Sequence, residues 1–202
     1  LEQQREKAYL PMQHLINTKR NTQTVQAFSQ TQYRFNENLS VQVGLHSLWL
    51  ALNGSFSIEP RASIRYDLDS KQTLSLGYGN HSMLQGWGIY FAQQNQGTAS
   101  NSTPNSDLGF SKAHHVVLSH QYSIQPNLRV KTEIYYQYLY QIPVSMSDTN
   151  TYSVLNSEND YMRDPLQNKG KGKNYGLEIS LEKYLTHHLY YTLSTSLYQA
   201  KY

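Results

Sequence analysis

The alternation of polar and apolar side chains from Ser57 to Tyr66 constrains the fold of this chain more than any other feature. Successive side chains of a β-strand point to opposite faces of the sheet, so a period of two predicts a strand with one wet face and one apolar face. The wet face holds Ser57, Glu59, Arg61, Ser63 and Arg65, and the apolar face holds Ile58, Pro60, Ala62, Ile64 and Tyr66.

The same pattern recurs along the chain and predicts about eight strands arranged as four hairpins. Short polar segments around residues 36–38, 67–71, 125–127 and 186–188 separate the two strands of each hairpin. We expect the hairpins to cover residues 24–50, 57–79, 116–140 and 175–197.

Composition excludes several classes of function. The chain has no cysteine, which rules out disulfides, thiolate zinc sites and cysteine nucleophiles. The net charge is only +3, and the basic residues are dispersed apart from Lys169, Lys171 and Lys173, so no nucleic-acid partner is expected. No run of apolar residues is long enough for a membrane-spanning helix. Any membrane role is therefore expected to fall to strands or to the protein surface.

Connection lengths indicate what kind of sheet this is. Turns within hairpins are short, whereas two links between hairpins, residues 82–112 and 142–173, run to roughly thirty residues each. Short turns at one rim, long loops at the other and strands of about ten to thirteen residues are typical of outer-membrane barrels. The sequence therefore predicts an all-β fold of antiparallel transmembrane β-barrel strands.

Several segments resemble a known family. The nine residues from Ile58 to Tyr66, of sequence IEPRASIRY, resemble a strand common in TonB-dependent receptors, especially those of Bacteroidetes. Further segments of the same family pattern follow in the same order at residues 77–82, 113–118, 133–137 and 168–178, and the resemblance spans roughly residues 45–202. It implies a larger barrel of roughly 22 strands around an N-terminal plug, powered through the TonB protein and importing a scarce nutrient.

The resemblance also sets expectations for the domain and its partners. Residues 1–202 are expected to form a partial outer-membrane β-barrel domain without the plug and the terminal strands, and residues 1–22 a weakly patterned lead-in loop. Because the chain begins at Leu1, we expect an excerpt or a processed form. The expected partners are the outer-membrane bilayer, the receptor's own plug domain, TonB through that plug, and an extracellular small ligand. No cofactor and no enzymatic activity are expected.

Two groups of candidate site residues follow. Charged side chains on wet faces are predicted to line the lumen and to orient the plug, although simple solvation and mutual pairing would account for them too. These lumen candidates are Glu59, Arg61, Arg65, Arg129, Lys131 and Glu133. Residues near the first long link are predicted to contact extracellular ligand, with packing within the loop as the alternative. They are Asn80, His81, Trp87 and Tyr90.

Three other chemical interpretations are disfavoured. No sequence feature places Glu59 and Glu133 at the separation that a glycosidase needs. Neighbouring histidines, as in His114-His115 and His187-His188, point to opposite faces of a strand and cannot chelate a metal from one side. The Lys-Gly alternation from residue 169 to 173 lacks the spacing of a phosphate-binding loop.

Two rival functions remain open from sequence alone. A self-contained eight-stranded outer-membrane barrel fits the even strand count, and its loops would mediate adhesion or form a small channel. A soluble β-sandwich that binds carbohydrate is disfavoured by the strand length and by apolar faces that a second sheet would have to cover. The nature of the transported ligand is also open.

Overall fold

A computed structural model describes residues 19, 21–95, 101–157, 161–186 and 188–202. The predicted lead-in loop therefore lies almost wholly outside the described residues, as does His187. The long strands are β1 (Thr24–Arg34), β2 (Leu39–Leu50), β3 (Phe56–Asp67), β4 (Gln72–Met83), β7 (Ser111–Gln125), β8 (Leu128–Ser145), β9 (Leu166–Thr186) and β10 (Leu189–Lys201). Between β4 and β7 lie the short helix α2 (Trp87–Tyr90) and the two-residue strands β5 (Gln94–Asn95) and β6 (Asn101–Ser102).

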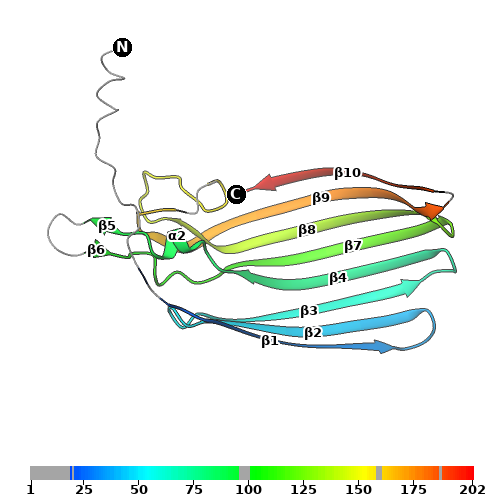
Figure 1. Cartoon of the computed structure of the whole chain (residues 1–202), viewed down its shortest axis with the longest axis horizontal. Helices are drawn as coiled ribbons and strands as arrows, with labels where there is room; N and C mark the ends of the chain where they lie inside the picture. The colour runs from blue at the N-terminus through cyan, green and yellow to red at the C-terminus, as the bar shows by residue number, and fades with distance from the viewer. Residues whose placement is uncertain (1–18, 20, 96–100, 158–160, 187) are drawn as a thin grey trace, which may run out of the picture.

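The eight long strands form one antiparallel sheet in the order β1-β2-β3-β4-β7-β8-β9-β10. Every long strand pairs with its neighbours in sequence, as a meander does, and Figure 1 shows them side by side. This confirms the predicted all-β fold of about eight antiparallel strands. The outermost strands β1 and β10 do not pair with each other in the described part of the chain, so the sheet stays open.

The short turns gather at one end of the sheet and the longer links at the other (Figure 1). Local hydrogen bonds explain why the turns form where the sequence predicts them. The Asn36 side-chain oxygen accepts hydrogen bonds from the Asn38 and Leu39 amides. The Asp69 carboxylate does the same for Lys71 and Gln72, and these bonds lower the pKa of Asp69.

The second long link is shorter than the sequence indicates. β8 continues to Ser145 and β9 begins at Leu166, so paired strands extend well into residues 142–173. The pairing is irregular where Gln141 adopts a positive φ of 53°, and it resumes at Ile142, opposite Gly170. A β-bulge of this kind re-aims a strand without ending it, which the local sequence does not reveal.

The two faces of the sheet differ sharply in chemistry. Large apolar side chains on one face are left bare in mid-strand; Ile134 is 55% exposed and Val43 is 52% exposed. A continuous apolar surface of this kind suits hydrocarbon rather than water. It comprises Val43, Leu45, Ile58, Ile64, Leu74, Leu76, Val116, Leu118, Ile134, Ile179, Leu193 and Leu197. No helix among the described residues is long and apolar enough to cross a membrane.

The opposite, polar face is the one that the long links fold over. Leu48 and Leu50 share that face of β2 with His46, and both are buried. They belong to an apolar cluster built mostly from the links, which also contains Ile89, Tyr90, Phe91, Leu108, Phe110 and Leu166. The links are thereby anchored above the polar face at its far end.

Candidate functional site on the polar face

The most deeply buried charge of the sheet is Glu59, whose side chain is 3% exposed. Its carboxylate accepts hydrogen bonds from its own strand and from both neighbouring strands. The donors are His46 Nδ1 on β2 at 3.0 Å, the Arg61 guanidinium on β3 at 3.3 Å and the Ser82 backbone amide on β4 at 3.1 Å. A buried carboxylate needs such partners because burial without them is costly. Glu59 therefore ties β2, β3 and β4 together at the end that the links cover.

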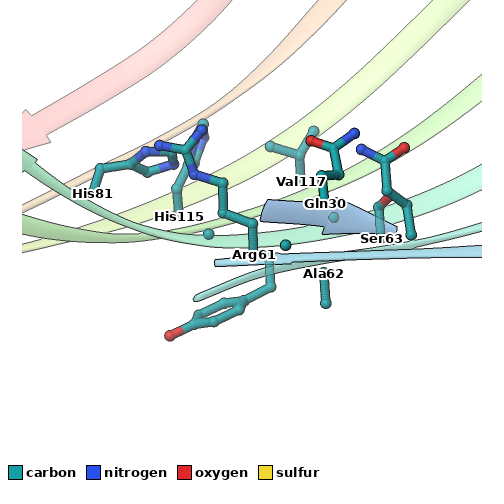
Figure 2. Close-up of a pocket in the computed structure, with 12 residues that line it drawn as sticks. Gln30, Arg61, Ala62, Ser63, His81, His115 and Val117 are labelled. Carbon is teal, nitrogen blue, oxygen red and sulfur yellow. The ribbon is translucent and has the colours of Figure 1, made fainter. Parts of the chain in front are cut away.

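Arg61 lies in a hollow of the polar face, beside this carboxylate. Its register partners on the two adjacent strands are Gly44 and Gly79, which have no side chains to fill the space. The hollow has a volume of about 310 Å³, and Figure 2 shows Arg61, His81 and His115 pointing into it together. The Arg61 side chain is 49% exposed, so its positive charge remains accessible from the polar side.

The other predicted lumen residues form ion pairs on the same face. Arg65 contacts Asp67 at 2.9 Å, Arg129 contacts Glu182 at 2.6 Å, and Lys131 contacts Glu133 at 2.7 Å. The register places all six predicted lumen residues on the polar face. The structure thus brings them onto one surface, but in separate pairs rather than in one network.

Sequence reasoning missed Glu178 as a site residue, although it adds a second negative charge beside Glu133. Glu133 on β8 is the register partner of Glu178 on β9, and both line a hollow of about 320 Å³ with His115, Tyr135 and Gln137. Two carboxylates directly opposite each other repel unless a cation lies between them. Of these two carboxylates, only Glu133 has a cationic partner, Lys131, among the ion pairs of the described residues.

A third cavity, of about 420 Å³, lies between the polar face and the links. Its lining is mostly apolar, with Leu84, Ile89 and Leu139 among the side chains, and it includes the polar residues His81 and Gln137. His81 lines both this cavity and the Arg61 hollow. The two cavities are therefore adjacent, one under the links and one deeper along the strands.

The predicted ligand contacts do not form one group. His81 lines both cavities, and Trp87 is 47% exposed with its ring stacked on Phe91. Tyr90 is completely buried in the apolar cluster, so its ring packs the link and has no surface to offer a ligand; burial also raises its pKa. Asn80 lies on the apolar face, where its amide donates to the Tyr140 hydroxyl at 3.1 Å.

The geometry bears on the chemical alternatives as well. Glu59 and Glu133 lie on β3 and β8, with β4 and β7 between them. Three strand spacings are roughly 14 Å, well beyond the separation of a glycosidase acid and base. His114 faces the apolar side and His115 the polar side, as adjacent strand residues must. No group of three or more potential metal ligands occurs among the described residues.

A long-stranded meander with a bare apolar face, a polar face and loops at one rim defines the wall of an antiparallel outer-membrane β-barrel. Residues 7–202 match the family described as "TonB dependent receptor-like, beta-barrel", so the chain belongs to that family. It is a family of outer-membrane receptors and transporters rather than of enzymes. The search of curated proteins finds no match.

Solved structures share the fold at low sequence identity. The siderophore receptor PirA from Pseudomonas aeruginosa superposes with a TM-score of 0.66 at 11% identity, over 89% of this chain and 35% of that one. The RagAB peptide importer superposes with a TM-score of 0.63 at 14% identity, over 88% of this chain and 22% of that one. The copper transporter OprC superposes with a TM-score of 0.59 at 15% identity, over 89% of this chain and 28% of that one. The chain spans 35% or less of each of these structures.

Proposed function

We propose that this chain is a barrel-wall segment of a TonB-dependent receptor that takes up a scarce extracellular nutrient through a larger barrel, of roughly 22 strands. The observation that carries the proposal is the open sheet: eight strands with a lipid-type face leave the outer edges of β1 and β10 without a partner among the described residues. Lipid does not tolerate unpaired strand edges, so further strands are needed to complete the wall. The same argument disfavours a self-contained eight-stranded barrel.

The polar face supports a role in holding a plug domain and, through it, a connection to TonB. Its ion pairs occupy the side that would face the lumen, and two of its features are incomplete by themselves. The Glu133–Glu178 pair would accept a basic side chain, and the hollow around Arg61 would accept an acidic one. The Arg65–Asp67 and Arg129–Glu182 pairs already satisfy each other and would contribute solvation and rigidity.

For the ligand, the cavity under the links supports contact with His81 and the nearby exposed Trp87. The similar structures are described as handling a siderophore, a peptide and copper, which gives no basis for choosing one cargo. Siderophores, corrinoids, saccharides and peptides all remain candidates. Tyr90 would act only by shaping the link, and Asn80 only from the apolar side. A Bacteroidetes origin remains part of this proposal.

Energised uptake tests the proposed function. Cells that express the complete reading frame should accumulate one labelled candidate from a panel of siderophores, corrinoids, saccharides and peptides. Accumulation should disappear in a strain that lacks TonB or when the proton-motive force is collapsed. Uptake that continues unchanged under both conditions would mean a passive pore and would contradict the proposal.

Refolding residues 1–202 alone tests whether the sheet needs further strands. We expect aggregation or misfolding in detergent micelles, because the outer edges of β1 and β10 have no partners in the part of the chain that the structure describes. Circular dichroism together with heat-modifiable migration on a gel provides the measurement. A compact, heat-modifiable β species would instead favour the self-contained eight-stranded barrel.

A further inference from the structure

The Lys-Gly alternation from Lys169 to Lys173 has a structural explanation that the proposed function does not use. Gly170 packs closely against β8 and Gly172 against the link between β8 and β9: a Cβ atom on Gly170 would lie 2.5 Å from Val144 Cγ1, and one on Gly172 would lie 3.1 Å from the Leu155 side chain. The close approach of these side chains favours glycine at both positions. The intervening lysines consequently point to the opposite side, the apolar face.

These lysines extend the apolar face beyond its aromatic border. Lys169, Lys171 and Lys173 are all exposed, and they lie two to six residues beyond Tyr175 on the same face of β9. At about 3.3 Å per residue they cover roughly 7 to 20 Å of strand past that tyrosine. Tyrosines mark the depth of the membrane interface, so the lysines reach into the outer headgroup layer.

The charge of this surface is unbalanced. Lys173 is the register partner of Lys201 on β10, and directly opposed like charges are unfavourable unless an anion bridges them. None of the lysines at positions 169, 171, 173 and 201 forms an ion pair with a described residue. Every carboxylate of the eight long strands lies on the polar face instead, at Glu59, Asp67, Glu133, Glu178 and Glu182.

We propose that Lys169, Lys171, Lys173 and Lys201 form a binding site on the outer wall for the phosphate groups of anionic glycolipids in the outer leaflet of the outer membrane. Two observations support this occupant. The positions of the lysines along the strands place them in the layer where lipid phosphates lie, and no carboxylate of the strands competes for them. Nearby Tyr138, the register partner of Lys173, and Tyr175 would contact the sugar rings and acyl chains. The proposal rests on the outer-membrane location and does not depend on the cargo.

The test uses the complete receptor, purified in detergent and titrated with a diphosphorylated, acylated glucosamine disaccharide while lipid adducts are counted by native mass spectrometry. Each lysine near a membrane surface contributes about fivefold to affinity, so the double variant K171Q/K173Q should bind about 25-fold more weakly at low salt. Raising the salt concentration should weaken wild-type binding in the same direction. The matched control K71Q/K183Q removes two lysines from the short-turn end and should bind as the wild type does.

Two further binding measurements separate the effect of charge from the effect of a failure to assemble. The variant K171R/K173R retains both charges and should keep wild-type binding. The wild-type receptor should prefer the phosphorylated lipid over its enzymatically dephosphorylated form, a comparison that requires no substitution and survives if a glutamine variant fails to assemble. Equal binding of the two lipids by the wild type, or undiminished binding by an assembled K171Q/K173Q, would overturn the proposal.

Discussion

Replacing Glu59 with alanine should destabilise the barrel more than replacing any other charged residue of the polar face. The substitution removes the acceptor for the Ser82 amide and for His46 Nδ1, and each bond to a charged acceptor contributes roughly 1.5 to 3 kcal/mol. The Arg61 contact adds at most about 1 kcal/mol, because the guanidinium is 49% exposed and screened. We expect a total loss of about 4 kcal/mol, near the middle of the range for breaking a buried charged network.

Urea unfolding of the complete receptor in lipid vesicles, followed by tryptophan fluorescence, provides the assay. Glu59→Gln should lose about half as much, because its amide oxygen still accepts from the Ser82 backbone while the ionic component disappears. Glu37→Ala, in the exposed turn between β1 and β2, serves as the control and should change the free energy of unfolding by less than about 0.5 kcal/mol. If Glu59→Ala unfolds like Glu37→Ala, the network does not hold the three strands together.

Three further predictions concern the apolar face, the strand packing and the links. Ile134→Lys in the middle of the apolar face should cost about 2 to 4 kcal/mol of vesicle-embedded stability in urea unfolding, and a neutral effect would mean that this face does not meet lipid. Gly176→Ala should cost about 1 to 3 kcal/mol in the same assay, because a Cβ atom would lie 2.7 Å from the Leu197 carbonyl oxygen and 2.8 Å from the Tyr135 hydroxyl; wild-type stability would show that the sheet relaxes freely there. Burial raises the pKa of Tyr90 above 10.0, so its contribution to the link cluster is complete below pH 10 and is lost as the pH rises through the folded-state pKa. Protease cleavage of the links should increase over that alkaline range in the wild type and less so in Tyr90→Phe.

The strands and their two faces were predictable because alternation acts locally. The alternation of polar and apolar side chains from Ser57 to Tyr66 defines the strand and shows which side chains lie on each face. It does so without information about the neighbouring strands. The extension of β9 back to Leu166 was not predictable in this way. Gly170 and Gly172 have low strand propensity, and the reason for them is the close approach of Val144 and Leu155, which only the tertiary packing reveals.

The candidate site also has features that the local sequence predicts and features that depend on tertiary structure. The face of Glu59 follows from alternation, but its partners His46 and Ser82 depend on the register of three strands, which the sequence does not specify. Glu178 is missed as a site residue for the same reason, since it meets Glu133 across a long link. Asn80 differs, because its sequence position already indicated its face. It lies two residues after Tyr78 on the same strand and therefore points to the apolar face, so the prediction of a ligand contact, made from its position near a loop, did not use the alternation.

Charge is divided between the two faces according to what each environment tolerates. By register, the polar face carries equal numbers of basic and acidic strand residues, namely Arg34, Arg61, Arg65, Arg129 and Lys131 against Glu59, Asp67, Glu133, Glu178 and Glu182. A wall that is close to neutral exerts little net force on a charged solute that passes along it. A carboxylate on the apolar face would meet hydrocarbon and, near the outer rim, repulsion from lipid phosphates, whereas a lysine can lay its methylene groups along the apolar surface and extend its ammonium group toward those phosphates. The confinement of acids to one face is thus what a wall between lipid and an aqueous lumen requires, and introducing a carboxylate at Lys171 should oppose membrane assembly more strongly than glutamine does.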